Sequence, residues 1–281
     1  MRTDEEVLSQ FGEWAKNNEL VRAAVLTSSR VDPSREIDFL SDYDIELYVS
    51  DLTPFKRDDA WLSDFGPIMV RWPLKPRSTF QEGWITRLIL FKDGVRIDFQ
   101  ITDQLIIHPD AYGEGYMVLV DKDDLTSDLA PPTYAKYIIR KPTRGEYDDR
   151  INAFWWDVAY VPKYLWRDEL PMAAYMMGEA VRGKFLREVI EWHIGLVNEW
   201  SVNTGLHGKW FKHFLSDEIW VEYESTFAGA DIEDHWAAFF NAVSLFSRLA
   251  KGVGDGLGYA YPTQLDQEMT DYYMQIRNTQ K

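Results

Sequence analysis

The stretch that decides the fold is "SDYDIELYV", residues 41–49, in which two aspartates open an apolar, β-branched run. Side chains alternate along a strand, so Asp42 and Asp44 point to one face while Tyr43 and Ile45 point to the other. Two like charges side by side destabilise a sheet unless something binds them. Two interpretations are open at this point, a solvated strand end and a site for a divalent cation.

A third carboxylate comes from "VRIDFQI", residues 95–101, where Arg96, Asp98 and Gln100 alternate with apolar residues. A charge in the middle of a strand needs a partner or a metal. Three carboxylates from two neighbouring strands could hold two Mg²⁺ ions roughly 3.5–4 Å apart, the arrangement that supports in-line displacement at phosphorus. Asp42, Asp44 and Asp98 are therefore the candidate catalytic and metal-binding residues. Glu46 shares their face and is interpreted as a solvated neighbour or a supporting group.

The order of elements predicts an α+β fold with two domains. The first half alternates short helices and strands: a helix at 4–18, strands at 21–29 and 42–49, a helix at 55–66, a strand at 67–72 and a hairpin at 84–102. Beyond about residue 145 the pattern is helical, over 148–166, 168–203, 206–215, 217–227 and 231–251, and the last 25 residues are expected to be irregular. We therefore expect a mixed sheet flanked by helices in residues 1–145 and a helical bundle in residues 146–281.

The composition narrows the class of protein. The 281 residues carry a formal net charge of −16 and contain no cysteine. The absence of cysteine excludes disulfides, a thiol nucleophile and cysteine metal ligands. The negative charge disfavours nucleic acid and anionic membranes as partners and favours a cationic small molecule, although solubility alone would also explain it. No apolar run approaches the roughly 20 residues of a membrane span, and no signal peptide is visible, so a cytoplasmic protein is expected. The oligomeric state is not indicated.

The stretch "LTSSR", residues 26–30, is a candidate phosphate-binding turn. A strand that ends in small hydroxyl residues can present N–H groups and hydroxyls to a phosphate, although an ordinary serine-rich turn has the same sequence. No G-x-x-x-x-G-K-[ST] motif is present, and "GVGDGLG" at 252–258 follows a helix where a dinucleotide fingerprint would follow a strand. A bound nucleotide would therefore depend on metal ions and this short turn.

These features in this order resemble the polymerase-β-type nucleotidyltransferases. The blocks "SSRVDP", "DYDI", "LILFKDGVRIDF", "REVIEWHIG" and "GKWFKHFL" are similar to those of the bacterial streptomycin 6-adenylyltransferases. The resemblance implies Mg²⁺ and ATP, with Ser28, Ser29 and Arg30 at the triphosphate and Lys209 and Lys212 reaching the phosphates from the second domain. Where the family has Gly-Ser this chain has Ser28-Ser29, and a side chain at position 28 crowds the approach of a phosphate.

The resemblance also implies an acceptor site in the helical half. Glu169 and Glu179 match family acids that could bind a cationic drug, and Trp155 could offer a ring; the alternatives are exposed helix acids and a core ring. The implied reaction is transfer of AMP to a hydroxyl of an aminoglycoside, streptomycin first, with Asp98 as the base. Two alternatives are open: another acceptor, such as a lincosamide or a protein hydroxyl, and an inactive nucleotide-binding regulator. The family has an acid near the position of Tyr175, in a region expected to face the antibiotic, and this difference affects the choice of acceptor.

Overall fold

A computed structural model describes residues 2–33, 36–77 and 81–280, and the chain forms two compact units, Met1–Lys136 and Tyr137–Lys281. The division falls earlier than the boundary of 145/146 expected from the sequence. The turn-rich segment before residue 144 belongs with the helices, because Ile139 is buried in their core and its N–H donates to the carbonyl of Val202 at 3.0 Å. No helix among the described residues is long and apolar enough to cross a membrane.

The first unit is built on a six-stranded mixed sheet with the strand order β3-β4-β5-β2-β1-β6. Its strands are β1 (Val21–Thr27), β2 (Tyr43–Val49), β3 (Ile68–Arg77), β4 (Trp84–Phe91), β5 (Arg96–Thr102) and β6 (Met117–Asp121). The central pair, β2 and β5, is parallel, and the other four pairings are antiparallel. The predicted hairpin of β4 and β5 and the predicted strands β1 and β2 are confirmed.

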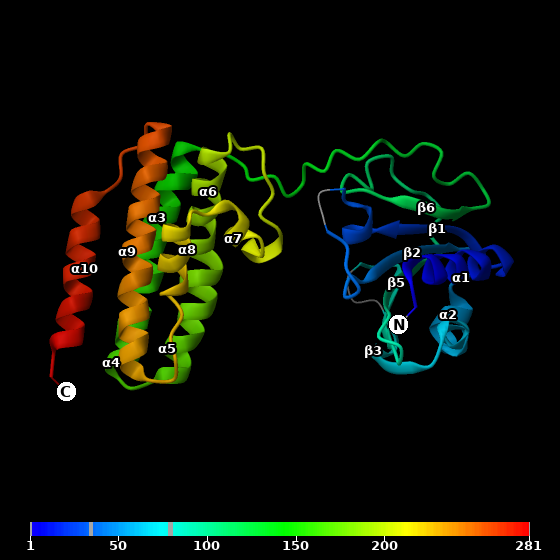
Figure 1. Cartoon of the computed structure of the whole chain (residues 1–281), viewed down its shortest axis with the longest axis horizontal. Coiled ribbons are helices and arrows are strands. Elements are labelled where there is room, and N and C mark those ends of the chain that lie inside the picture. The colour runs from blue at the N-terminus through cyan, green and yellow to red at the C-terminus, as the bar shows by residue number, and fades with distance from the viewer. Residues whose placement is uncertain (1, 34–35, 78–80, 281) are drawn as a thin grey trace. The chain divides into compact units, whose positions relative to one another are not determined.

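Helix α1 (Asp4–Asn17) covers one face of this sheet, as Figure 1 shows. It begins with a capping box, in which the Thr3 side chain accepts from the Glu6 N–H and the Glu6 side chain accepts from the Thr3 N–H. Val7 and Phe11 of its apolar stripe are fully buried against the sheet. Because the apolar side chains of β2 pack against α1 on this face, the carboxylates that alternate with them lie on the opposite face of the sheet.

The helix expected over residues 55–66 is wrong in its extent. The structure has two short pieces, α2 (Thr53–Arg57) and the 3₁₀ helix η2 (Ala60–Phe65). Asp58 between them is extended, with φ −154° and ψ 178°, and its carboxylate accepts from the Ala60 N–H at 3.1 Å. An aspartate that bonds to the backbone two residues on favours a turn over a continuous helix. A 3₁₀ helix, η1 (Ser28–Val31), follows β1.

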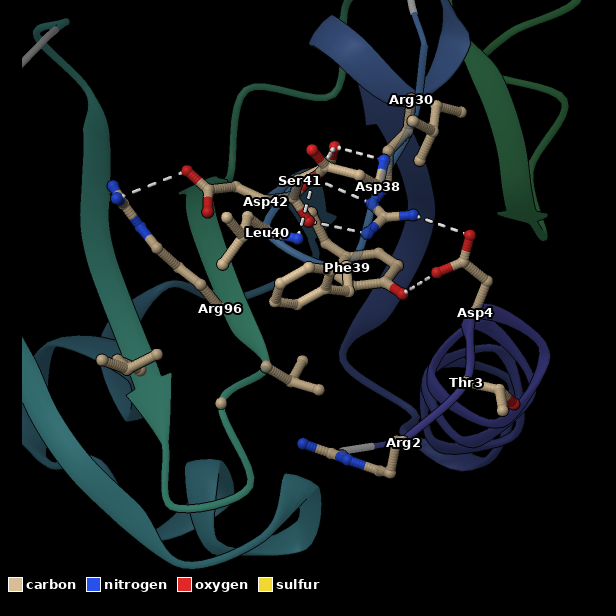
Figure 2. Close-up of a pocket in the computed structure, with 15 residues that line it drawn as sticks. Arg2, Thr3, Asp4, Arg30, Asp38, Phe39, Leu40, Ser41, Asp42 and Arg96 are labelled. Carbon is tan, nitrogen blue, oxygen red and sulfur yellow. Dashed lines mark hydrogen bonds and ion pairs between the residues drawn. The ribbon is translucent and has the colours of Figure 1, made fainter.

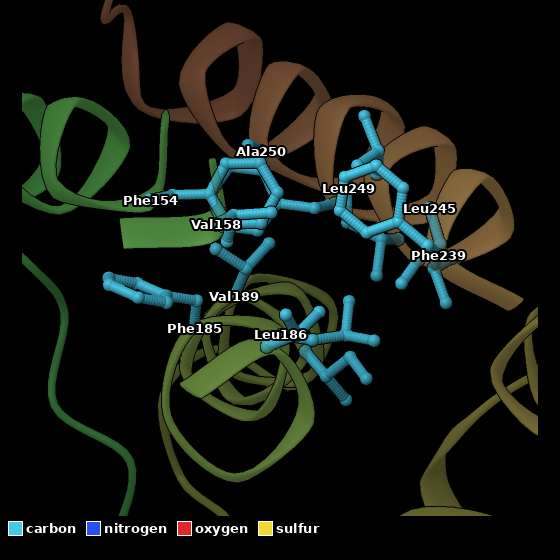
Figure 3. Close-up of a cluster of buried hydrophobic side chains, with 14 of the residues drawn as sticks. Phe154, Val158, Phe185, Leu186, Val189, Phe239, Leu245, Leu249 and Ala250 are labelled. Carbon is cyan, nitrogen blue, oxygen red and sulfur yellow. The ribbon is translucent and has the colours of Figure 1, made fainter. Parts of the chain in front are cut away.

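The second unit is helical, as predicted. Its elements are α3 (Arg144–Val158), α4 (Tyr160–Trp166), α5 (Leu170–Met176), the π-helical η3 (Met177–Leu186), α6 (Arg187–Val197), the 3₁₀ helix η4 (Leu206–Gly208), α7 (Phe211–Phe214), α8 (Asp217–Glu224), α9 (Ile232–Leu257) and α10 (Thr263–Asn278). Figure 3 shows how apolar side chains of α3, η3, α6 and α9 meet in its core. At its centre the rings of Phe154 and Phe246 stack with centroids 3.5 Å apart.

Two sequence expectations for this unit are wrong. The helix expected over 206–215 is broken, because His207 and Gly208 in η4, before the start of α7, have positive φ angles of 56° and 73°. The irregular end expected for the last 25 residues is instead α10, whose Tyr273 is fully buried and donates to the Trp155 carbonyl at 3.1 Å. The apolar residues of α10 recur at helical spacing and pack on the core, which is sufficient to fix the helix.

Candidate active site

The site begins with the register of the parallel strands β2 and β5. Asp44 and Asp98 are direct partners in this register, so two carboxylates lie side by side on adjacent strands. Asp42 immediately precedes β2 on the same face. The side chains of Asp42 and Asp98 are 34% and 13% exposed, so the group is sheltered yet open to a ligand. The structure thus brings together the three carboxylates that the sequence analysis singled out.

Crowded negative charge makes this group unusual. Burial, followed by repulsion from Asp98 and Asp42, raises the pKa of Asp44 to about 6, and a hydrogen bond from the Ser28 hydroxyl opposes part of that rise. Burial also raises the pKa of Asp42, while Arg96 lowers it. Two carboxylates with raised pKa values, those of Asp42 and Asp44, gain stability from a nearby cation.

In this structure the cation is Arg96, two residues before Asp98 on the same face of β5. Its Nε and Nη2 donate to the two carboxylate oxygens of Asp98 at 3.0 and 2.8 Å. Its Nη1 lies 3.3 Å from Asp42, and Figure 2 shows the two side chains facing each other. The sequence analysis placed Arg96 on this face and gave it no role, although i, i+2 spacing on a strand was a sufficient signal for the contact.

The donor chemistry suits magnesium, which prefers carboxylate oxygens. Across residues 2–33, 36–77 and 81–280, however, no three acidic or histidine side chains are already gathered around a point that could hold a metal ion. Arg96 contacts two of the three carboxylates in this arrangement. The residues therefore fit a divalent ion in their chemistry, although their side chains do not surround a common point.

The serine-rich turn lies next to the carboxylates. Thr27 is the register partner of Asp44 across β1 and β2, so Ser28 comes immediately beyond it. Ser28 has a φ of 67°, a left-handed conformation that glycine adopts without strain and serine rarely adopts. Its hydroxyl bonds to Asp44, which gives this residue a contact that glycine could not make. Ser29 follows in η1 and is partly buried.

Arg30 is placed differently from the sequence expectation of a triphosphate ligand. Its side chain is 5% exposed and pairs with Asp4 at 2.9 Å. It also donates to the backbone carbonyls of Ser41 and Asp42 at 2.6 and 3.0 Å, and its guanidinium lies 3.6 Å from the centroid of the Tyr43 ring. Figure 2 shows these bonds. In this arrangement Arg30 positions the turn that carries Asp42 and has little capacity left for a phosphate.

A pocket of about 390 Å³ opens beside Asp42 (Figure 2). Arg30, Asp42 and Arg96 form its polar wall, and the loop before β2 contributes Phe39 and Leu40. Each of these two apolar side chains is 70% exposed. The pocket therefore combines charged groups next to the carboxylates with an apolar surface.

Glu46 is not the solvated neighbour that was one interpretation of the sequence. It is partly buried and accepts hydrogen bonds from the hydroxyls of Tyr48, at 3.1 Å, and Tyr112. Burial raises its pKa, and the two tyrosine hydroxyls lower it. The Glu46 carboxylate therefore lies on the same face of the sheet as Asp44, next to two tyrosine hydroxyls. Its bond to Tyr112 anchors the loop around that residue to the sheet. No sequence pattern indicates the contact with Tyr112, which is distant in the chain.

The predicted residues of the helical unit are spread over several elements. Lys209 and Lys212 are exposed, with their ammonium groups 4.7 Å and 5.3 Å from the rings of Trp210 and Trp220. Lys209 precedes α7 and Lys212 lies within it, so the two lysines do not belong to one helix. Glu169 at the start of α5 and Glu179 in η3 are both exposed.

Trp155 lies in the core of the helical unit. It is 2% exposed and packs edge-on against Phe154 with centroids 4.9 Å apart. A ring in this position offers no free face to a substrate, so the structure favours the packing interpretation over the binding one. Its neighbour Trp156 is 73% exposed.

A mixed sheet with paired carboxylates on adjacent parallel strands, followed by a helical unit, defines a nucleotidyltransferase of the two-domain class. The family model for streptomycin adenylyltransferase matches residues 1–276. The chain is 34% identical to an aminoglycoside 6-adenylyltransferase of Bacillus subtilis, covering 97% of both chains, and 30% identical to one of Campylobacter jejuni, covering 97% of this chain and 95% of the other. It is also similar to the crystal structure of an aminoglycoside 6-adenyltransferase from Bacillus subtilis, with a TM-score of 0.50 and 28% identity over 99% of this chain and all of the other. The chain belongs to the streptomycin adenylyltransferase family, which confirms the resemblance and the fold.

Proposed function

We propose that this protein transfers AMP from ATP to a hydroxyl of streptomycin or a related aminoglycoside, and thereby confers resistance to the drug. The observation that carries the proposal is the direct pairing of Asp44 with Asp98, with Asp42 alongside, in a chain of this family. The first compact unit, Met1–Lys136, would act as the nucleotidyltransferase domain and the second, Tyr137–Lys281, as the substrate-binding domain. A mass-spectrometric adenylylation screen over an antibiotic panel tests this function.

Each residue group has a role in the proposed reaction. Asp42, Asp44 and Asp98 would hold two Mg²⁺ ions, which offset negative charge on the α-phosphate and on the departing pyrophosphate. Ser28 and Ser29 lie beside these carboxylates and would receive the triphosphate. Asp98 would accept the proton of the attacking hydroxyl as that oxygen bonds to the α-phosphorus. Arg30 would keep Asp42 in place through its backbone carbonyl.

Lys209 gives a prediction about nucleotide binding. We expect Lys209→Ala to raise the KM for ATP about threefold to tenfold, because a charge-assisted bond to phosphate contributes about 0.7–1.4 kcal/mol at an exposed site. The melting temperature should hardly change, since the side chain is exposed. Lys251→Ala, at an exposed position of α9, is the matched control. An ATP KM that is the same for both variants and the wild type would show that Lys209 is a solvated surface residue that does not contact ATP.

The acceptor gives a second prediction, based on Glu169 and Glu179. The double change to glutamine should raise the KM for streptomycin about tenfold and leave that for ATP unchanged, because each exposed ion pair with a cationic drug contributes up to about 1 kcal/mol. The streptomycin KM of the wild type should rise with ionic strength, since screening acts over about 8–10 Å in ordinary salt. Steady-state kinetics at low and high salt measure both effects.

The control for the acceptor site is the same double change at Glu218 and Glu224, two exposed acids of α8. If both double variants raise the KM for streptomycin equally, the attraction between the drug and the protein comes from the net charge and not from particular acids. If neither does, the two predicted acids are not at the acceptor.

A further inference from the structure

The position of Arg96 has a consequence for the proposed metal site. Its guanidinium contacts both oxygens of Asp98 and one oxygen of Asp42, which are two of the three proposed ligands. A bidentate contact of this kind is among the stronger ion pairs in proteins. A dication about 2 Å from these oxygens would lie close to a guanidinium whose nitrogens are 2.8–3.3 Å from the same carboxylates, and the two cations would repel each other.

Arg96 is also placed where it can move. Its side chain is 44% exposed and forms part of the pocket wall, while Arg30 on the same wall is 5% exposed and held by the backbone. Rotation of an exposed arginine side chain requires no repacking of the core. Arg30 and Arg96 therefore differ in kind, since Arg30 is held by several bonds and Arg96 is able to leave its partners.

We propose that Arg96 is an internal counter-ion that competes with Mg²⁺ for Asp42 and Asp98, so that metal binding requires its displacement. The inference rests on the proposed function, since it takes these carboxylates as metal ligands. Arg96 stabilises the metal-free protein by neutralising the carboxylates, and by the same contacts it weakens the binding of free metal ions. It is a positioning residue and acts through the ligands.

The test is a titration of the protein with Mn²⁺ alone, followed by electron paramagnetic resonance, without nucleotide. Arg96→Gln should bind Mn²⁺ about fivefold to tenfold more tightly than the wild type, because the competing charge-assisted hydrogen bonds are removed. Arg96→Lys should lie between the two, since a lysine keeps the charge and loses the bidentate geometry. The matched control is Arg71→Gln, an arginine of β3 that is 39% exposed and pairs with Asp59.

Thermal melting separates this role from a purely structural one. In EDTA, Arg96→Gln should melt below the wild type, and saturating Mn²⁺ should restore it, because the metal then neutralises the same carboxylates. An Arg96→Gln protein with unchanged or weaker Mn²⁺ affinity would overturn the inference. The variant Asp44→Asn distinguishes the two proposals. If Asp44→Asn binds Mn²⁺ as the wild type does, the proposed metal site is wrong. If Asp44→Asn loses Mn²⁺ binding and Arg96→Gln shows no gain in affinity, only the inference about Arg96 is overturned.

Discussion

Asp44→Asn should reduce AMP transfer about a thousandfold or more, because losing one metal carboxylate removes several kcal/mol of transition-state stabilisation. Asp98→Asn should have an effect of the same size, since it would remove both a ligand and the proposed base. The measurement is the initial rate of pyrophosphate release with saturating ATP, Mg²⁺ and streptomycin. Asp103→Asn, at an exposed position just after β5, is the control that should keep full activity.

The same substitution should stabilise the metal-free protein. Asp44 has a folded pKa of about 6 against an ordinary value of 3.8, so its ionisation opposes folding. The wild type therefore loses the stability that protonated Asp44 allows as the pH rises from 3.8 toward about 6, because the unfolded chain releases this proton more readily. Asp44→Asn has no proton to release at this position and does not show that loss. At pH 7 in EDTA the variant should melt about 2–4 °C higher, allowing for partial exposure of the group. Near-wild-type turnover in both Asp44→Asn and Asp98→Asn would contradict the metal site.

Asp59→Ala should cost about 3–5 kcal/mol in the free energy of unfolding of the first unit, because it leaves a buried arginine without its counter-ion. Arg87 is fully buried on β4, and its Nε donates to Asp59 at 2.8 Å. Asp59 is itself only 8% exposed, and its other oxygen also bonds to Arg87. Equilibrium unfolding in guanidinium chloride, followed by a signal from the first unit, measures the loss.

The comparison for Asp59 is a surface ion pair of the same type. Arg57 and Asp58 pair at 3.0 Å with side chains 77% and 47% exposed, so Arg57→Ala should cost less than about 1 kcal/mol. Equal losses in the two variants would show that burial of Arg87 does not set the cost.

The sequence predicts the sheet and its acidic face because strand alternation is a local rule. The positions of Asp42 and Asp44 in one strand and of Asp98 in another follow from period-two patterns within a few residues. The same rule could not reveal what Arg30 or Glu46 contacts, since their partners Asp4 and Tyr112 are distant in the chain. Tertiary contacts of polar side chains carry no periodic signal.

The C-terminal end of α9, which was not predicted, has a different cause. The glycines of "GVGDGLG" are typical of a loop, yet most of this stretch is the last part of α9. A Cβ on Gly254 would lie 2.6 Å from the Tyr147 hydroxyl, and one on Gly256 would lie 2.5 Å from the Leu196 side chain. Close packing between helices therefore favours glycine here, and packing overrides the low helix propensity of the residue.

Transfer of AMP to streptomycin can be tested in one competition experiment. Purified protein is incubated with ATP and Mg²⁺ and an equimolar mixture of streptomycin, a deoxystreptamine aminoglycoside and a lincosamide, and the products are analysed by mass spectrometry. We expect one AMP to be added to streptomycin with release of pyrophosphate, and no addition when ATP is omitted or when Asp44→Asn replaces the wild type. Adenylylation of the lincosamide alone, or no adduct on any acceptor, would contradict the account.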